Sequence, residues 1–168
     1  MEAGWKVVFI DESIFSVKAY ITKGIFKIGS KPTVKYIHTR EKICVLGGLS
    51  ESFFTSQMAD NLDNTTYLPF VKSLIRKYGK VVIIIDGAKY HFEKEHVKKY
   101  YGDNEDKLKV IQLPAYSPEL NPIEQVWKKI KKWLAIRIWY TVEEMETQLI
   151  YVLNNPDFMV KIYDYYLR

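Results

Sequence analysis

The chain has 168 residues, of which 48% are hydrophobic and 15% aromatic, enough for one well-packed core, so we expect a single globular domain. Its formal net charge of +5, from 25 Lys and Arg against 20 Asp and Glu, mildly favours a polyanionic partner. The single cysteine, Cys44, excludes an internal disulfide, and no run approaches about 18 consecutive apolar residues, so we expect a soluble, intracellular protein with no membrane partner.

The N-terminal part of the chain is predicted to form a meander of strands. Apolar runs favour a buried strand over residues 7–10 and two short strands over 14–21 and 25–28. A further strand is predicted over 43–49, interrupted by two glycines, and 51–58 is expected to pair with it across a tight turn.

Helices and strands alternate in the rest of the chain. Apolar residues at helical spacing predict a helix that is capped by Thr65 or Thr66 and ends near Gly79. The run 81–85 has no polar alternation, which predicts a central strand covered on both faces. The later elements are predicted as a helix over 93–101, a strand over 109–113, a rigid proline-rich loop over 114–122, a helix over 123–134 whose apolar stripe includes Trp127, and a helix over 142–153. This order predicts a mixed sheet in an α/β layer fold.

Three carboxylates lie at the ends of predicted elements. Asp11 and Asp86 each follow an apolar strand, and Glu124 lies in the first turn of a helix. Two Mg²⁺ ions about 3.5–4 Å apart can activate a water or a 3′-hydroxyl group and stabilise the leaving oxygen at a phosphate. Because Mg²⁺ keeps several waters, a few Asp and Glu side chains on rigid elements suffice to bind it. We therefore predict a metal-dependent phosphoryl-transfer site at these three residues.

Each carboxylate also has a purely structural interpretation. Asp86 precedes a glycine, and an Asp in that setting is more often a turn or cap residue than a metal ligand. Glu124 fits a capping box in which Asn121 is the N-cap of the helix, although the stiff loop before it favours a fixed direction for its side chain. Glu12 competes with Asp11 for a metal role, and strand alternation decides between them only once the fold is known.

Basic residues lie near these carboxylates. Lys128 and Lys131 share the predicted helix face of Glu124, while Lys89 and His91 follow the second Asp. We predict that these four residues contact phosphate groups of DNA, in binding that is independent of sequence and sensitive to salt. The alternatives are a solvated helix face, on which Lys128 pairs with the carboxylate one turn before it, and a helix cap at His91.

Three segments carry a resemblance to a known family. Residues 113–127, LPAYSPELNPIEQVW, look like the signature of the D-D-E transposases of the mariner superfamily, specifically the insertion sequence 630 group. Residues 9–13, FIDES, resemble the first-strand motif of that group, and residues 85–91, IDGAKYH, resemble its second motif. Together the three segments span most of the chain.

The resemblance implies a ribonuclease H-like fold, a mixed central sheet flanked by helices, with Asp11, Asp86 and Glu124 as the catalytic, metal-binding residues. It implies two Mg²⁺ ions per site, for which Mn²⁺ substitutes, and no organic cofactor. The implied reaction is cleavage of DNA at element ends and transfer of the 3′-hydroxyl into target DNA. Such enzymes generally work as paired subunits, so a homodimer is expected, in the cytoplasm or at the nucleoid.

Two features depart from the family pattern. Only ten residues precede Asp11, which leaves no room for a helix-turn-helix region, so we expect residues 1–168 to be a single D-D-E catalytic domain without it. Gly87 stands where the family commonly has Asn, and we expect weakened rather than abolished chemistry. The alternative functions are another ribonuclease H-like nuclease, acting on RNA–DNA hybrids or branched DNA, and a catalytically silent DNA-binding or assembly module.

Overall fold

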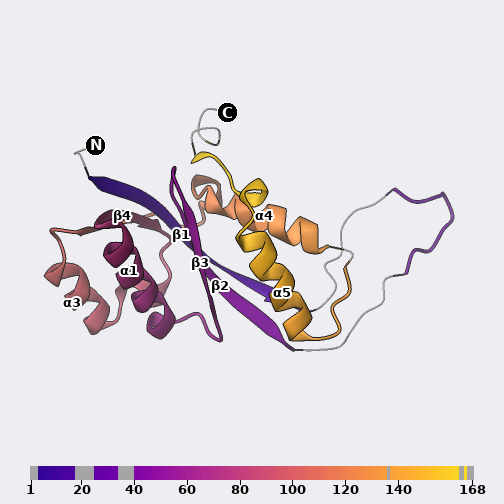
Figure 1. Cartoon of the computed structure of the whole chain (residues 1–168), viewed down its shortest axis with the longest axis horizontal. Coiled ribbons are helices and arrows are strands. Elements are labelled where there is room, and N and C mark those ends of the chain that lie inside the picture. Colours follow the sequence, from indigo (N-terminus) through magenta and orange to yellow (C-terminus); the bar gives the residue numbers. More distant parts are fainter. Residues whose placement is uncertain (1–3, 18–24, 34–39, 136, 163–164, 166–168) are drawn as a thin grey trace.

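The computed structural model of the chain describes residues 4–17, 25–33, 40–135, 137–162 and 165. Its elements in chain order are β1 (Trp5–Ser16), β2 (Lys42–Leu49), β3 (Phe54–Ala59), α1 (Asn64–Tyr78), β4 (Lys80–Ile85), α2 (Lys89–Phe92), α3 (Glu95–Asp103), β5 (Leu108–Gln112), the 3-10 turn η1 (Pro118–Leu120), α4 (Ile123–Leu134), α5 (Val142–Leu153) and the 3-10 turn η2 (Pro156–Phe158) (Figure 1). The helices predicted over 123–134 and 142–153 are confirmed as α4 and α5.

Five strands form one mixed sheet in the order β3-β2-β1-β4-β5. β2 runs antiparallel to both β1 and β3, whereas β1, β4 and β5 are parallel. Phe9 of β1 pairs with Ile84 of β4. The positions two residues further along the two parallel strands, Asp11 and Asp86, therefore lie beside each other where β4 ends.

Helices cover both faces of the sheet, with α1 and α3 on one side and α4 and α5 on the other (Figure 1). The side chains of β1 alternate between the two cores: Val8 and Ile10 pack with α1, whereas Phe15 packs with α4 and α5. This arrangement confirms the predicted α/β layers.

β4 is central in the sheet, as predicted, but it is fully covered on one face only. Val81, Ile83 and Ile85 are completely buried on the side of α1, while Val82 and Ile84 on the other side are half-buried. The expectation of a strand covered on both faces is therefore confirmed only in part, because α4 and α5 pack mainly over β1 and β2.

The ends of α1 follow from its capping residues. Asp63 is the N-cap, one position before Asn64. Its carboxylate accepts a hydrogen bond from the backbone N–H of Thr65 at 2.8 Å, and its own N–H donates to the hydroxyl of Thr66 at 3.2 Å. The two threonines lie inside the first turn of α1 and complete a capping box with Asp63, so the prediction of either one as the N-cap was wrong. The predicted end at Gly79, with φ of 80°, is confirmed.

Several predicted boundaries change. β1 is continuous to Ser16, so no separate strand begins at residue 14, and residues 18–21 of that prediction lie outside the described residues. Residues 25–28 form no strand, and Ile25 and Ile28 are fully exposed. The two glycines of β2 leave it unbroken, and β3 pairs beside it as predicted. The helix predicted over 93–101 is α3, preceded by the short α2.

Candidate active site

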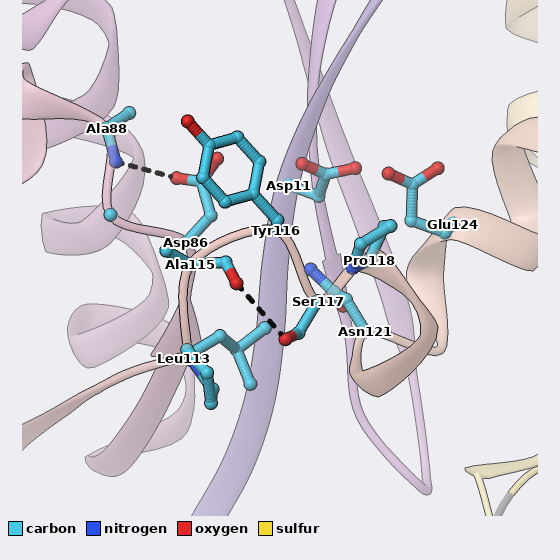
Figure 2. A pocket seen from close by; sticks show the side chains of 12 residues that line it. Asp11, Asp86, Ala88, Leu113, Ala115, Tyr116, Ser117, Pro118, Asn121 and Glu124 are labelled. Carbon is cyan, nitrogen blue, oxygen red and sulfur yellow. Dashed lines mark hydrogen bonds between the residues drawn. The ribbon is translucent and has the colours of Figure 1, made fainter.

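A pocket of about 400 Å³ brings the three predicted carboxylates together where β4 ends. Asp11 on β1, Asp86 just after β4 and Glu124 on α4 all line it. Figure 2 shows their side chains directed into this pocket, with Tyr116 in front of Asp86. Residues 113–118 form another part of its wall, and all but the first of them belong to the loop predicted to be rigid over 114–122.

Asp11 is half-buried in this pocket and is held by a tryptophan. The indole Nε1 of Trp127 donates a hydrogen bond to its Oδ2 at 2.9 Å. Burial, together with the negative charges of Glu124 and Glu12, raises the pKa of Asp11 to about 8, although the hydrogen bond from Trp127 acts in the opposite direction. A carboxyl group in these surroundings favours either a proton or a bound cation.

The indole reaches Asp11 because Gly47 leaves it space. Gly47 pairs with Asp11 in the sheet, and a Cβ atom at position 47 would lie 2.6 Å from two ring carbons of Trp127. The sequence assigned Trp127 only to the core. Its spacing of i, i+3 from Glu124 is the signal that both side chains lie on one face of the helix.

Strand alternation places Asp11, and not its rival Glu12, in the pocket. Glu12 points to the opposite face of the sheet, where its Oε1 lies 3.0 Å from Nε2 of His91. The side chain of Glu12 is only 8% exposed there.

Asp86 both stabilises a turn and lines the pocket. Its Oδ1 accepts a hydrogen bond from the backbone N–H of Ala88 at 3.1 Å and lies 3.2 Å from Nδ1 of His91. The turn interpretation is therefore correct for this oxygen, yet the side chain remains 56% exposed. The interaction with His91 and the Ala88 N–H lower the pKa of Asp86, although partial burial opposes them.

His91 is fully buried between two carboxylates. Nε2 forms a hydrogen bond of 3.0 Å with Oε1 of Glu12, whereas Nδ1 lies 3.2 Å from Oδ1 of Asp86 in an ion pair that lacks hydrogen-bond geometry. Both carboxylates favour the protonated ring. Burial acts to lower the pKa of His91, but the hydrogen bonds and charges of Asp86 and Glu12 outweigh it and raise this pKa to about 9. The expected contact of His91 with a phosphate does not fit this placement, because its side chain has no exposed surface.

Glu124 does not cap its own helix. The N-cap of α4 is Pro122, without a side-chain hydrogen bond. The buried side chain of Asn121 instead donates from Nδ2 to the backbone oxygen of Ile10 at 3.2 Å, which ties the loop to β1 beside the first Asp. The capping-box interpretation was therefore wrong, and Glu124 faces the pocket from the first turn of α4 (Figure 2).

The loop before α4 contains one unusual backbone conformation. The N–H of Leu113 donates to the oxygen of Ile85 at 2.8 Å, which extends the pairing of β5 with β4 into the loop. Tyr116 then adopts a left-handed φ of 57° with its side chain fully exposed, and the Ser117 hydroxyl donates to the Ala115 oxygen at 3.3 Å. A left-handed non-glycine residue costs about 1–3 kcal/mol and persists where its surroundings require it.

The side chain of Gln112 occupies the space that a side chain at residue 87 would need. A Cβ atom at residue 87 would lie 2.5 Å from Nε2 of Gln112, at the end of β5. A side chain larger than glycine at this position therefore requires the Gln112 amide to move.

The three predicted DNA-binding lysines lie on helices next to the pocket. Lys89 is exposed on α2, and Lys128 is exposed on α4. Lys131 is half-buried, with its Nζ 5.8 Å from the ring centroid of Phe15. The residues that line the pocket include none of the three lysines.

The three carboxylates fit a metal ion by their chemistry and their shared pocket. In the part of the chain that the structure describes, no three His, Cys, Asp or Glu side chains lie close enough together to form a metal cluster. Mg²⁺ uses only one or two carboxylates and completes its shell with waters and substrate oxygens, so it does not need such a cluster. Burial, and after it the negative charges of Glu124 and Glu12, raise the pKa of Asp11, and a divalent cation would neutralise that charge.

The sequence matches the family of DDE superfamily endonucleases over residues 6–146. The chain belongs to this family. A search of curated proteins finds no match. The prediction of a DDE superfamily domain is confirmed, and the insertion sequence 630 subgroup stays a prediction.

The fold of this DDE endonuclease domain is similar to that of the Mos1 transposase. The mariner Mos1 paired end complex with Mg has a TM-score of 0.71 and 17% identity, over 96% of this chain and 51% of that chain. The Mos1 strand transfer complex has a TM-score of 0.69 and 18% identity, over 90% of this chain and 48% of that chain. A third match is a chain of the simian T-cell lymphotropic virus intasome in complex with PP2A regulatory subunit B56 gamma. It has a TM-score of 0.55 and 7% identity, over 89% of this chain and 48% of that chain.

These similarities confirm the predicted ribonuclease H-like fold of the DDE endonuclease domain. The chain spans about half the length of the Mos1 chains. Among its described helices, none has the length and apolar character needed to span a bilayer.

Proposed function

We propose that this chain is the catalytic domain of a mariner-type transposase of the insertion sequence 630 group. In this proposal it cleaves DNA at element ends and joins the freed 3′-hydroxyl to target DNA. The observation that carries the proposal is the common pocket of Asp11, Asp86 and Glu124 within a DDE superfamily endonuclease. The two cores on either side of one sheet support a single catalytic domain. The Mos1 structures, named for paired ends and strand transfer, favour transposition over other nuclease reactions.

The proposed cofactor is a pair of Mg²⁺ ions, for which Mn²⁺ substitutes. Asp11 and Asp86, at neighbouring strand ends, would hold one ion, and Glu124 with Asp11 would hold the other. Bound there, the metal supplies an activated water or 3′-hydroxyl group and stabilisation of the leaving oxygen. Mos1 complexes with Mg and with Mn support this choice of metal.

The protein itself orients the carboxylates for this role. Trp127 binds Oδ2 of Asp11, and Ala88 with His91 contact Oδ1 of Asp86, so these contacts leave the other oxygen of each carboxylate for a metal ion. Because the pKa of Asp11 is raised to about 8, metal binding at neutral pH displaces a proton from this residue.

The proposed substrate contacts are electrostatic. Lys89, Lys128 and Lys131 lie on the two helices next to the pocket and are proposed to bind phosphates of the DNA backbone. Such contacts position the duplex without reading its sequence, and their strength falls as salt rises.

A homodimer is proposed as the working form. Residues 25–33 extend away from the sheet and helices (Figure 1), and Ile25 and Ile28 are fully exposed on this segment, with Phe26 at 58%. We propose these side chains as the contact between subunits, because exposed apolar patches commonly bind a partner. Replacing Ile25 and Ile28 with Ser is expected to shift the chain toward monomer in sedimentation equilibrium.

The test of the proposed function is cleavage and joining of labelled DNA in Mg²⁺ or Mn²⁺, with RNA–DNA hybrids and branched DNA as parallel substrates. Wild type is compared with Asp86→Asn and with Asp106→Asn, a matched control whose side chain is 68% exposed beside Lys107. We expect metal-dependent cleavage and joining of duplex DNA that is lost in Asp86→Asn and retained in Asp106→Asn.

Other outcomes overturn the proposal. Preferential cutting of the hybrid or of branched DNA would identify another ribonuclease H-like nuclease. Binding of duplex DNA without cleavage, equal in wild type and Asp86→Asn, would identify a catalytically silent binding module.

A further inference from the structure

We infer that His91, held in place by Glu12, is a positioning residue that fixes the direction of the Asp86 carboxylate toward the metal site. This inference rests on the proposed function, because it concerns how one proposed metal ligand is held.

Asp86 needs such support because of its position. It follows the last residue of β4, so the sheet does not hold its side chain, which is 56% exposed. The two described contacts, with the N–H of Ala88 and Nδ1 of His91, both involve Oδ1. Contacts to one oxygen from two directions restrict rotation of the carboxylate and leave Oδ2 for the pocket.

The imidazole ring of His91 is itself rigidly placed. Its centroid lies 4.4 Å from that of the Tyr67 ring and 4.2 Å from that of the Tyr90 ring. The Tyr101 hydroxyl donates to the His91 backbone oxygen at 3.0 Å and lies 2.8 Å from the Tyr67 hydroxyl. The ring is therefore enclosed by aromatic side chains and hydrogen-bonded backbone, and it has no exposed surface.

Glu12 completes the arrangement from the sheet. On β1 it follows Val8 and Ile10 on the face that packs with α1, so an apolar residue is the ordinary choice at this position. A buried carboxylate without a partner is costly, and an apolar pair in its place is often at least as stable. The contact of Glu12 with Nε2 of His91, at 3.0 Å, orients the ring so that Nδ1 faces Asp86. Protein groups behind a metal ligand commonly act in this way.

Two substitutions separate the two contacts of His91. An Asn side chain carries its amide near the position of Nδ1, whereas a Gln side chain carries it near the position of Nε2. His91→Asn therefore keeps a donor for Asp86, and His91→Gln keeps only a group that faces Glu12. His96→Gln is the matched control, because His96 is exposed on α3 and contacts Asn64 on the surface.

The experiment is titration of Mn²⁺ into each protein, followed by electron paramagnetic resonance, with the unfolding temperature and the metal dependence of DNA cleavage measured in parallel. We expect His91→Gln to raise the Mn²⁺ dissociation constant at least about tenfold, the lower end for lost outer-shell contacts. His91→Asn is expected to raise it less, and His96→Gln to leave it unchanged. Saturating metal is expected to restore part of the cleavage by His91→Gln.

Two results overturn the inference. One is an equal Mn²⁺ affinity in His91→Gln and wild type. The other is a loss of Mn²⁺ affinity that is equal in His91→Gln and His91→Asn and is proportional to the fall in their unfolding temperatures. Either result leaves the proposed function intact if wild type cuts DNA. Conversely, wild type that binds Mn²⁺ in an Asp86-dependent way but cuts no DNA refutes the proposed function alone, and wild type that binds no Mn²⁺ refutes both.

Discussion

Trp127 and Asp11 are joined by a hydrogen bond of 2.9 Å between the helix that carries Glu124 and the central strand of the sheet. Because Trp127 lies one turn after Glu124 on α4, the contact fixes the helix against β1 at the pocket. One side chain thus sets both the direction of the Asp11 carboxylate and the distance across the site.

Replacing Trp127 with Phe removes the donor and keeps an aromatic ring in the core. We expect the free energy of unfolding to fall by about 2 kcal/mol, because the buried Asp11 carboxyl group loses its hydrogen-bond donor, and metal affinity to fall about tenfold. Denaturant unfolding and Mn²⁺ titration measure the two effects. Trp133→Phe is the control, since Trp133 lies on the same helix but packs against Phe158. Equal metal affinity in both variants contradicts the role of the indole N–H.

Gly47 is expected to tolerate no side chain. In Gly47→Ala the new Cβ would lie 2.6 Å from the Trp127 ring, so α4 has to shift, and we expect destabilisation of about 1–3 kcal/mol with loss of DNA cleavage. Gly102→Ala is the control, because Gly102 lies in α3 with nothing within 4 Å of its Cβ position. There we expect a gain of up to about 1 kcal/mol and unchanged cleavage. Thermal unfolding and the cleavage assay distinguish the two.

The contribution of Asp11 to the stability of the metal-free protein is expected to fall between pH 4 and pH 8. Asp11 has a usual pKa of 3.8 in the unfolded chain and about 8 in the folded protein. At a pH below its unfolded-state pKa, Asp11 is protonated in both states and does not change the free energy of unfolding. As pH rises, the unfolded chain ionises first and is favoured, until both states are ionised above the higher value.

Asp11→Asn, which cannot ionise, is therefore expected to be more stable than wild type at pH 8 without metal, and this advantage is expected to disappear near pH 4. Mg²⁺ at about 100 times its dissociation constant is expected to stabilise wild type by about 2.7 kcal/mol and the variant much less. Denaturant unfolding at the two pH values measures both effects. A constant difference between the two proteins across this range would refute the raised pKa.

Tyr116 is expected to increase DNA affinity while it lowers the free energy of unfolding. Its left-handed backbone favours glycine, so Tyr116→Gly is expected to raise the free energy of unfolding by about 1 kcal/mol, whereas Tyr116→Ala is expected to leave it nearly unchanged. Its exposed ring at the pocket is suited to stacking on a base, so both variants are expected to bind DNA about tenfold more weakly. Unchanged DNA affinity in both would exclude stacking.

Much of the site follows from local sequence alone. Apolar runs that end at Asp11 and Asp86 predict strands with carboxylates at their ends, and a helical apolar pattern places Glu124 in a first turn. These patterns depend on the strand and helix periods, which act over a few residues. The long string at residues 113–127 was sufficient to indicate the family, now matched over residues 6–146.

The remaining features depend on contacts between residues far apart in the chain. Packing of β1 between two layers decided that Asp11 faces the pocket while Glu12 faces His91. The same packing buries His91, which the sequence predicted as a phosphate contact. It also brings Asn121, predicted as a helix N-cap, into a hydrogen bond with the backbone of β1. Local periodicity indicates which segments form strands and helices, but which face is covered, and by which partner, is decided only when the layers pack together.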